Sequence, residues 1–188
     1  EKSGAQIVYG PTAVTSFPSH IATDGEEFKV GDLTITALHT PGHTLESTTY
    51  LLTDKDGVKH CIFSGDTLFI GDVGRPDLAQ KGDLTMEDLA SILYDSLHTK
   101  IMTLPDEIIV YPAHGAGSAC GKSMSKETFD TLGHQKEVNY ALKATSKEQF
   151  IKEVTDGILP PPQYFAKNVA MNKGGYESFE NVMKKGNT

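Results

Sequence analysis

Three short turns follow apolar, β-rich runs, and they constrain the fold more than any other feature of the chain. They are Pro41-Gly42-His43-Thr44, Ser64-Gly65-Asp66-Thr67 and Tyr111-Pro112-Ala113-His114. Each turn places a His or an Asp where a strand gives way to a loop. Two imidazoles and a carboxylate from separate strand ends are the donors that a nitrogen/oxygen metal site needs. The sequence therefore predicts a sheet whose strand ends gather His43, Asp66 and His114 at one metal site.

The composition is that of one globular domain. A chain of 188 residues can bury a sizeable core, and its 38% of hydrophobic residues excludes a disordered chain. No apolar run approaches the roughly 20 residues of a bilayer span, so we expect no membrane partner. The net charge of −8 argues against nucleic acid or an anionic membrane surface. Two cysteines, Cys61 and Cys120, are too few for a disulfide framework, and a reducing, cytoplasmic location is expected.

Local patterns predict strands in the first half and mixed elements afterwards. Six segments have the alternating or apolar patterns of strands, the middle four forming two hairpins: residues 6–9, 28–30, 33–38, 48–53, 59–64 and 107–111. Three helices are predicted: one after the N-cap Thr85 and continuing to Leu97, one over 126–143 with a break at Gly133, and one over 147–159 with a capping box at Ser146 and Gln149. This order predicts a layered α/β or α+β architecture.

The three turns also resemble a known family. Pro41-Gly42-His43-Thr44, Gly65-Asp66-Thr67-Leu68-Phe69 and Pro112-Ala113-His114 resemble the later metal-binding motifs of the metallo-β-lactamase superfamily. The resemblance implies an α+β fold, the metallo-β-lactamase-like αββα four-layer sandwich with metals at one edge. The family's first motif, His-x-His-x-Asp-His, occurs nowhere in the chain and is expected before Glu1, so the N-terminal part of the fold is expected to be missing here.

Two further segments resemble one branch of that superfamily. Residues 71–78, Gly-Asp-Val-Gly-Arg-Pro-Asp-Leu, are similar to the signature of persulfide dioxygenases, and residues 112–122 resemble the branch fused to rhodanese domains. The resemblance implies a partial metallo-β-lactamase-like domain over 1–162. Residues 163–188, which are polar and rich in Gly and Asn, are then an arm or linker towards a fused or separate rhodanese domain.

By this resemblance, one Fe(II) is held by two histidines and one aspartate. His43 and Asp66 are two of these ligands, and the third is a histidine of the missing first motif. His114 becomes a catalytic residue near the metal that binds water, substrate or a second metal. The implied reaction oxidises a small persulfide, carried by a glutathione-like thiol, to sulfite with O₂. The facial arrangement of three ligands leaves positions open for both reactants.

Arg75, Lys122 and Cys120 carry the remaining site predictions. Arg75 is expected either to have a functional role, holding a carboxylate of the thiol carrier or ordering the groups around Asp66, or to form an ion pair with Asp77 that shapes its loop. Lys122 is a second candidate for substrate binding, and its charge could shift the nearby Cys120 towards thiolate. Cys120 is either a catalytic residue that contacts or transiently carries the persulfide sulfur, or a small residue packed in a Gly-rich loop.

Two alternatives share the same motifs. A dinuclear zinc thioester hydrolase of the glyoxalase II type would use His43, His114 and a bridging Asp66 to activate hydroxide. A non-catalytic fragment could instead serve as a scaffold for a rhodanese domain, and self-association into a homo-oligomer is left open. The other imidazoles and the second thiol are interpreted as surface or packing residues: His20, His39, His60, His98, His134 and Cys61.

Overall fold

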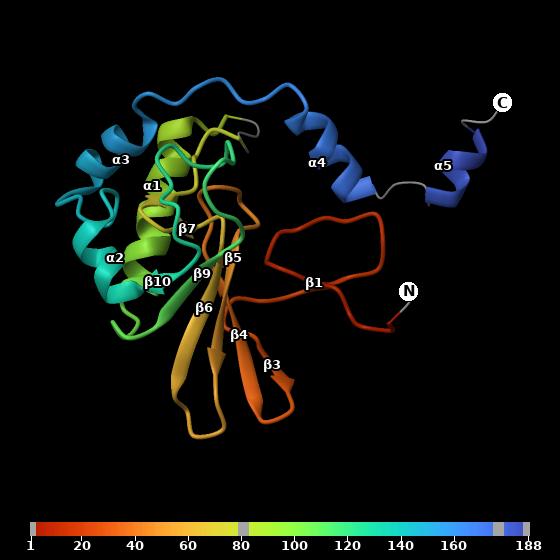
Figure 1. Cartoon of the computed structure of the whole chain (residues 1–188), viewed down its shortest axis with the longest axis horizontal. Coiled ribbons are helices and arrows are strands. Elements are labelled where there is room, and N and C mark those ends of the chain that lie inside the picture. The colour runs from red at the N-terminus through yellow and green to blue at the C-terminus, as the bar shows by residue number, and fades with distance from the viewer. Residues whose placement is uncertain (1–2, 79–82, 175–178, 186–188) are drawn as a thin grey trace.

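A six-stranded mixed sheet forms the centre of the computed structural model, which describes residues 3–78, 83–174 and 179–185 (Figure 1). Its strands lie in the order β10-β9-β6-β5-β4-β3. The bounds in chain order are β3 Glu27–Val30, β4 Leu33–His39, β5 Thr48–Thr53, β6 Lys59–Gly65, β9 Ile109–Pro112 and β10 Asp130–Thr131. The hairpins β3–β4 and β5–β6 confirm the two hairpin predictions, and β6 pairs with β9 in parallel.

Two small sheets accompany the large one. β1 (Val8–Tyr9) pairs with β2 (His20–Ile21) in parallel, beside the large sheet. β7 (Leu68–Phe69) pairs with β8 (Asp72–Val73) as an antiparallel hairpin directly after the turn that carries Asp66. The β7–β8 hairpin carries the chain from the end of β6 across the end of the large sheet.

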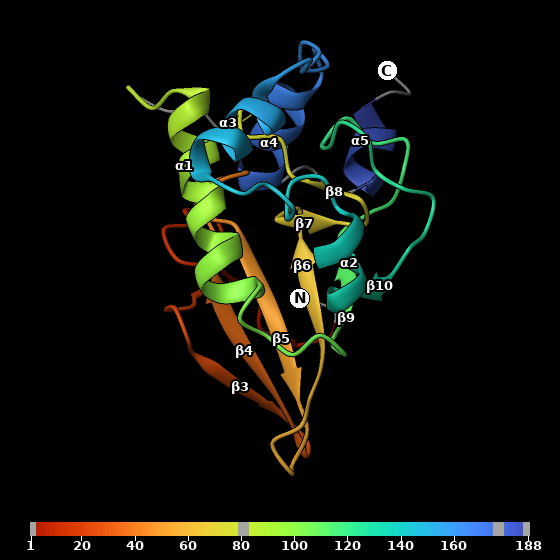
Figure 2. The same ribbon diagram turned by 90° about the vertical axis from the view of Figure 1, so that its left-hand side faces the viewer.

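Three helices pack on one face of the large sheet, as Figure 2 shows for the long helix beside β5. They are α1 (Met86–Ser96), which continues as a π-helix over Leu97–Ile101, α2 (Leu132–Val138) and α3 (Lys147–Thr155). The predicted N-cap of α1 is confirmed, because Thr85 and Asp88 form a reciprocal capping box. None of the helices in the described ranges has the length and the apolar run that a membrane crossing requires.

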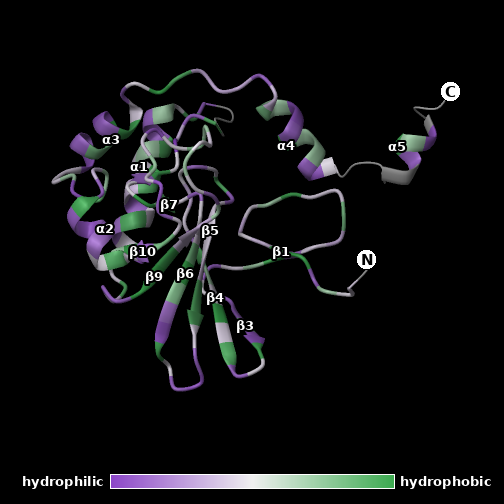
Figure 3. Cartoon of the chain, in the orientation of Figure 1, coloured by the Kyte–Doolittle hydropathy of each residue, from purple (hydrophilic) through white to green (hydrophobic). Residues whose placement is uncertain are grey.

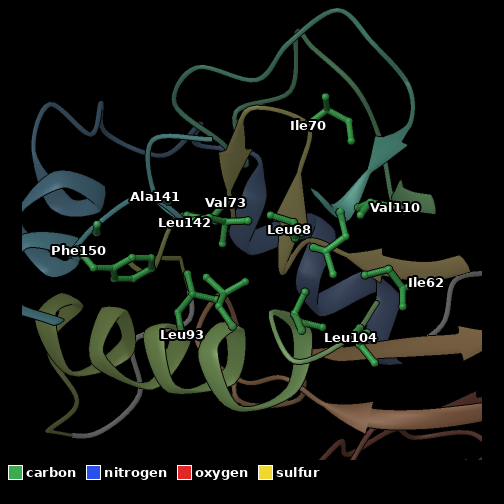
Figure 4. Packing of buried hydrophobic residues seen from close by; sticks show 14 of the residues in the cluster. Ile62, Leu68, Ile70, Val73, Leu93, Leu104, Val110, Ala141, Leu142 and Phe150 are labelled. Atoms are coloured by element: carbon green, nitrogen blue, oxygen red, sulfur yellow. The ribbon is translucent and has the colours of Figure 1, made fainter. Parts of the chain in front are cut away.

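The core lies between this sheet face and the helices (Figure 4). Leu51, Ile62 and Val110 of three neighbouring strands belong to the same buried cluster as Leu93 of α1 and Phe150 of α3. Burying each side chain of this size stabilises the fold by about 1.5–3 kcal/mol. Figure 3 shows hydrophobic segments, in green, along the strands of the large sheet and in the helices beside it.

The helix predicted over residues 126–143 is present but much shorter than predicted. The chain is extended at β10, and α2 begins only at Leu132, where the Thr131 hydroxyl accepts a hydrogen bond from the N–H of His134. Gly133 lies inside α2 rather than at a break. A Cβ at this position would lie 2.9 Å from the Cβ of Asp106, so the first turn of α2 can pack there only with glycine.

The third predicted helix ends earlier than expected, and its cap differs from the predicted box. Ser146 caps α3 by accepting from the N–H of Gln149, but the Gln149 side chain accepts from the N–H of Thr145 instead of from Ser146. Beyond α3, the tail contains α4 (Phe165–Gly174) and α5 (Phe179–Lys185), two helices that the sequence pattern did not predict. The assignment of the tail as an arm or linker stays a prediction.

Candidate metal centre

Strand direction explains why the three turns meet. β4 and β6 are both antiparallel to β5, and β9 is parallel to β6, so β4, β6 and β9 all run the same way. Their carboxyl ends therefore lie at the same end of the sheet. His43 follows β4, Asp66 follows β6 directly, and His114 follows β9.

The two predicted imidazoles contact opposite oxygens of one carboxylate. His43 Nε2 lies 3.3 Å from Asp66 Oδ2, and His114 Nε2 lies 3.5 Å from Asp66 Oδ1. His43 is buried, whereas Asp66 and His114 are partly exposed. The ring of His114 also packs on Phe69, with 4.7 Å between the ring centroids. The structure thus brings together all three residues that were predicted as metal ligands, with Asp66 at the centre.

A hydrogen bond fixes how His43 faces Asp66. Its Nδ1 lies 2.8 Å from the carbonyl oxygen of Arg75, which can only accept, so Nδ1 carries a proton. In the neutral ring Nε2 is then an acceptor, and it faces a carboxylate oxygen that is also an acceptor. Such a pair is stable only with a cation between the two atoms, either a proton on Nε2 or a bound metal ion. The donors of the site therefore fit a metal.

Asp66 is held in its charged form. Burial opposes ionisation of this carboxyl, but the hydrogen bond from His43 and the charges of the His43 and His114 imidazoles outweigh it. The pKa of Asp66 consequently lies below its ordinary value. An ionised oxygen ligand at neutral pH is what a divalent cation requires.

Buried hydroxyls and one close backbone approach support the ligand turns. The Thr40 hydroxyl bonds to those of Thr67 and Thr49, at 2.8 and 3.1 Å, which links the loops that carry His43 and Asp66. Gly74 closes the other side. A Cβ there would lie 1.9 Å from the carbonyl oxygen of Asp66 and 2.9 Å from the Cβ of His43, so only glycine fits.

Arg75 is buried and fully engaged. Its Nε and Nη2 donate to the two carboxylate oxygens of Asp77 at 2.6 and 2.7 Å, and its Nη1 donates to the carbonyl oxygen of Ala119 at 3.1 Å. Nη2 also donates to the carbonyl oxygen of Leu159. The ion pair with Asp77, one of the two expectations for Arg75, is present. Its substrate-binding role stays a prediction.

Cys120 forms a cluster of three potential metal donors with His43 and Asp66. One donor atom from each of His43, Asp66 and Cys120 lies within 4.8 Å of the others. Burial has the largest effect on the Cys120 thiol and raises its pKa; the Ser118 hydroxyl lowers it, and the Asp66 carboxylate raises it further. The sequence placed Cys120 near the site but did not identify it as a metal donor.

Lys122 points away from this thiol. Its ammonium group donates to the carbonyl oxygens of Glu153 and Asp156, at 2.5 and 3.1 Å, and lies over the ring of Tyr140. Lys122 was expected to lower the pKa of Cys120. This pKa is shifted by burial and by the groups of Ser118, Asp66 and Arg75, and Lys122 is not among them. Substrate binding by Lys122 stays a prediction.

Asp72 is a buried residue of the site region for which the sequence analysis predicted no role. Its Oδ2 accepts the backbone N–H groups of Lys122 and Ser123, both at 2.5 Å, and its Oδ1 accepts the hydroxyl of Tyr140 at 2.9 Å. Burial, together with the neighbouring Asp72 charge, raises the pKa of Tyr140. The sequence does contain a signal for this role: Asp72 lies in an apolar stretch between Ile70 and Val73, and a carboxylate that is buried there needs several hydrogen-bond donors.

The residues set aside as surface or packing positions have ordinary partners. Cys61 is buried in β6, and the five histidines contact nearby acids, a carbonyl oxygen or an aromatic ring: His20 with Glu26, His39 with Leu45, His60 with Asp54, His98 with Tyr94 and His134 with Asp130. The burial of Cys61 and the contacts of the five histidines confirm that these residues occupy core, packing or surface positions.

Comparisons with known proteins give this site a context. The family model of the metallo-beta-lactamase superfamily matches residues 2–114. Among solved structures, a metallo-beta-lactamase from Staphylococcus aureus has a TM-score of 0.84 and 34% identity, covering 94% of this chain and 53% of that chain. ETHE1 from Myxococcus xanthus has a TM-score of 0.73 and 32% identity, covering 92% of this chain and 67% of that chain.

Curated relatives include two kinds of enzyme. The mitochondrial persulfide dioxygenase ETHE1 of Mus musculus is 31% identical over 160 residues, which is 85% of this chain and 55% of that protein. A hydroxyacylglutathione hydrolase of Neisseria meningitidis is 38% identical over 107 residues, which is 57% of this chain and 38% of that protein. The chain thus spans about half the length, or less, of these curated relatives.

Proposed function

Because the chain belongs to the metallo-β-lactamase superfamily, we propose that it carries the metal centre of a persulfide dioxygenase. The reaction would oxidise a thiol-carried persulfide with O₂ and release sulfite and the thiol. The extent of the similarity supports this function most strongly: the match to a persulfide dioxygenase covers 85% of the chain, whereas the match to a hydroxyacylglutathione hydrolase covers 57%.

The metal of this centre would be a single Fe(II), held by His43 and Asp66. The third protein ligand would be a histidine from a segment that the printed sequence does not contain. The fit rests on geometry: His43 Nε2 and Asp66 Oδ2 lie 3.3 Å apart, and both are atoms that ligate metals. When bound, the iron would supply the site at which O₂ and the persulfide sulfur react.

The residues of the chain would orient the reactants around that metal. The carbonyl oxygen of Arg75 fixes the His43 ring, so that Nε2 faces the metal position. His114 lies on the far oxygen of Asp66, with the Ser118 hydroxyl 3.4 Å from its Nε2, and would bind water or the substrate. Cys120 has its sulfur within 4.8 Å of ligand atoms of His43 and Asp66 and would contact the persulfide sulfur.

A neighbouring cavity would hold the thiol carrier. It has a volume of about 390 Å³ and is lined by Arg75, Ser118, Lys122, Leu159 and Pro162 among others. A volume of a few hundred Å³ is typical of small-molecule sites. A larger cavity of about 640 Å³ beside Ile7 and Phe17 is lined by Ala5, Gln6, Ile7, Phe17, Pro18 and Ser19 and has no titratable side chain, so we assign the carrier to the cavity at Arg75.

Product analysis tests this function. The iron-loaded protein that contains these residues is incubated with glutathione persulfide, and sulfite and oxygen consumption are measured. We expect sulfite to form with uptake of O₂, and both to be lost in Asp66→Ala. Absence of sulfite, together with hydrolysis of a glutathione thioester and two zinc ions per chain, would establish the hydrolase instead. Absence of both activities would leave the scaffold role.

A further inference from the structure

We propose that Cys120 is a metal ligand, and that His43, Asp66 and Cys120 together hold one thiophilic divalent cation such as Zn²⁺. This site uses only donors of the printed chain. It goes beyond the proposed iron centre, in which the third ligand comes from elsewhere and Cys120 only contacts the substrate.

The separations of the donor atoms suit a single ion. Tetrahedral zinc sites have bonds of about 2.0–2.3 Å, which place neighbouring donor atoms roughly 3.5 Å apart. His43 Nε2 and Asp66 Oδ2 are already 3.3 Å apart. The Cys120 sulfur lies within 4.8 Å of one ligand atom of His43 and one of Asp66, so it needs to approach them by about 1.3 Å at most, which a rotation of its side chain can supply.

The backbone of Cys120 is held at this position by the rest of the fold. Its carbonyl oxygen accepts the N–H of Arg75 at 3.0 Å, and its own N–H donates to the Ser118 hydroxyl at 3.2 Å. The carbonyl oxygen of Arg75 in turn accepts a hydrogen bond from Nδ1 of His43. The same backbone segment therefore positions the imidazole and the thiol towards each other, as a built ligand set requires.

The chemistry of the three donors selects the class of metal. An imidazole, a carboxylate and a thiolate together favour zinc, cobalt or cadmium over the hard cations magnesium and calcium. Binding replaces the thiol proton by the metal, so the Cys120 S–H bond breaks, the proton goes to solvent and no electron is transferred. Three protein donors leave one position of a tetrahedral site open for water or an exogenous thiol.

Cobalt substitution tests this site without any catalytic assay. The 188-residue chain is titrated with Co²⁺ under anaerobic, reducing conditions, and the near-ultraviolet absorption from thiolate-to-cobalt charge transfer is recorded. We expect a band that saturates at one cobalt per chain. Cys120→Ser should lose the band and weaken cobalt binding by about 100-fold or more, since even changes around a ligand cost about 10–100-fold. Cys61→Ala, which removes the other thiol from β6, should keep both.

Alkylation of the wild-type chain gives a second readout that does not depend on a folded variant. Zn²⁺ should protect Cys120 from iodoacetamide, with the modified cysteine identified by mass spectrometry. No charge-transfer band in the wild type, a band that persists in Cys120→Ser, or unprotected Cys120 at saturating Zn²⁺ would each refute the thiolate ligand. Because no persulfide is present, failure of these tests is distinct from failure to form sulfite.

Discussion

Replacing Asp72 by Asn should destabilise the chain through a set of hydrogen bonds that the structure defines closely. Asp72 is fully buried. Its Oδ2 accepts two backbone N–H groups, those of Lys122 and Ser123, and its Oδ1 accepts the N–H of Val73 and the hydroxyl of Tyr140. An amide of the same size keeps one oxygen acceptor but presents N–H groups where the other oxygen was.

The expected loss in the free energy of unfolding depends on which way the introduced amide is oriented. With its oxygen towards Lys122 and Ser123, its N–H groups face Tyr140, whose hydroxyl can accept, and the N–H of Val73, which cannot. The unsatisfied N–H costs about 1–3 kcal/mol, and the remaining bonds lose their charge-assisted share of about 1 kcal/mol or less each. We therefore expect the free energy of unfolding to fall by about 2–4 kcal/mol.

Urea unfolding of Asp72→Asn and Tyr140→Phe provides the measurement and its matched control. Tyr140→Phe removes one bond to the same carboxylate and should cost about 1 kcal/mol. The alkylation rate of Cys120 should rise in Asp72→Asn more than in Tyr140→Phe, because only the first change weakens the anchor at Lys122 and Ser123. An unfolding free energy within about 0.5 kcal/mol of wild type, with an unchanged alkylation rate, would refute this anchoring role.

Three further predictions concern the site, the core and the acid response. Gly74→Ala should abolish the cobalt charge-transfer band, because its Cβ would overlap the carbonyl oxygen of Asp66 at 1.9 Å; a band of wild-type intensity would contradict this packing. Leu93→Ala should lower the unfolding free energy by about 2–5 kcal/mol, since the side chain is fully buried, whereas Val14→Ala at an exposed position should change it by less than about 0.5 kcal/mol; calorimetry separates the two. Burial opposes ionisation of Asp130, but hydrogen bonds from His134 and Gln135 lower its pKa below 3.8, so the stability it contributes is present above that pH and is lost as pH falls through the folded-state pKa. Asp130→Asn should therefore be less stable than wild type at about pH 6, with a difference that vanishes in acid; a pH-independent difference in urea titrations would contradict the linkage.

The parts of the fold that the sequence predicts are those whose cause is local. The β3–β4 and β5–β6 hairpins are marked by polar turns with glycine between alternating runs, and the start of α1 by the cap at Thr85. The parallel pairing of β6 with β9 has no such local signal. It depends on α1 crossing between them, and it is this pairing that brings His114 to Asp66.

The error at residues 126–143 also has a physical source. Helical spacing of apolar residues continues through Phe129, but the Asp130 carboxylate turns to bond His134 and Gln135, and the Thr131 hydroxyl starts the helix one residue later. Side chains that bond the backbone at a helix start override periodicity. A pattern of apolar spacing alone cannot locate that start.

The ligands of the candidate site divide in the same way. His43 and Asp66 could be predicted because each lies in a turn at the end of its own strand, and the direction of the strand fixes where the side chain goes. Cys120 has no strand of its own. Its position depends on Arg75 and Asp72, which lie more than 40 residues earlier in the chain and reach it only in the folded state.

Those two buried residues hold the loop that carries Cys120. The N–H of Arg75 donates to the carbonyl oxygen of Cys120, and the carboxylate of Asp72 accepts the N–H groups of Lys122 and Ser123, so the backbone is fixed at and just after the thiol. Because the carbonyl oxygen of Arg75 also orients His43, moving Arg75 would displace two donors of the metal centre at once. The buried ion pair with Asp77 keeps Arg75 in place, since a guanidinium that lost this partner would be an unpaired charge in the interior. The Arg75–Asp77 ion pair thus helps to set the positions of the candidate metal ligands.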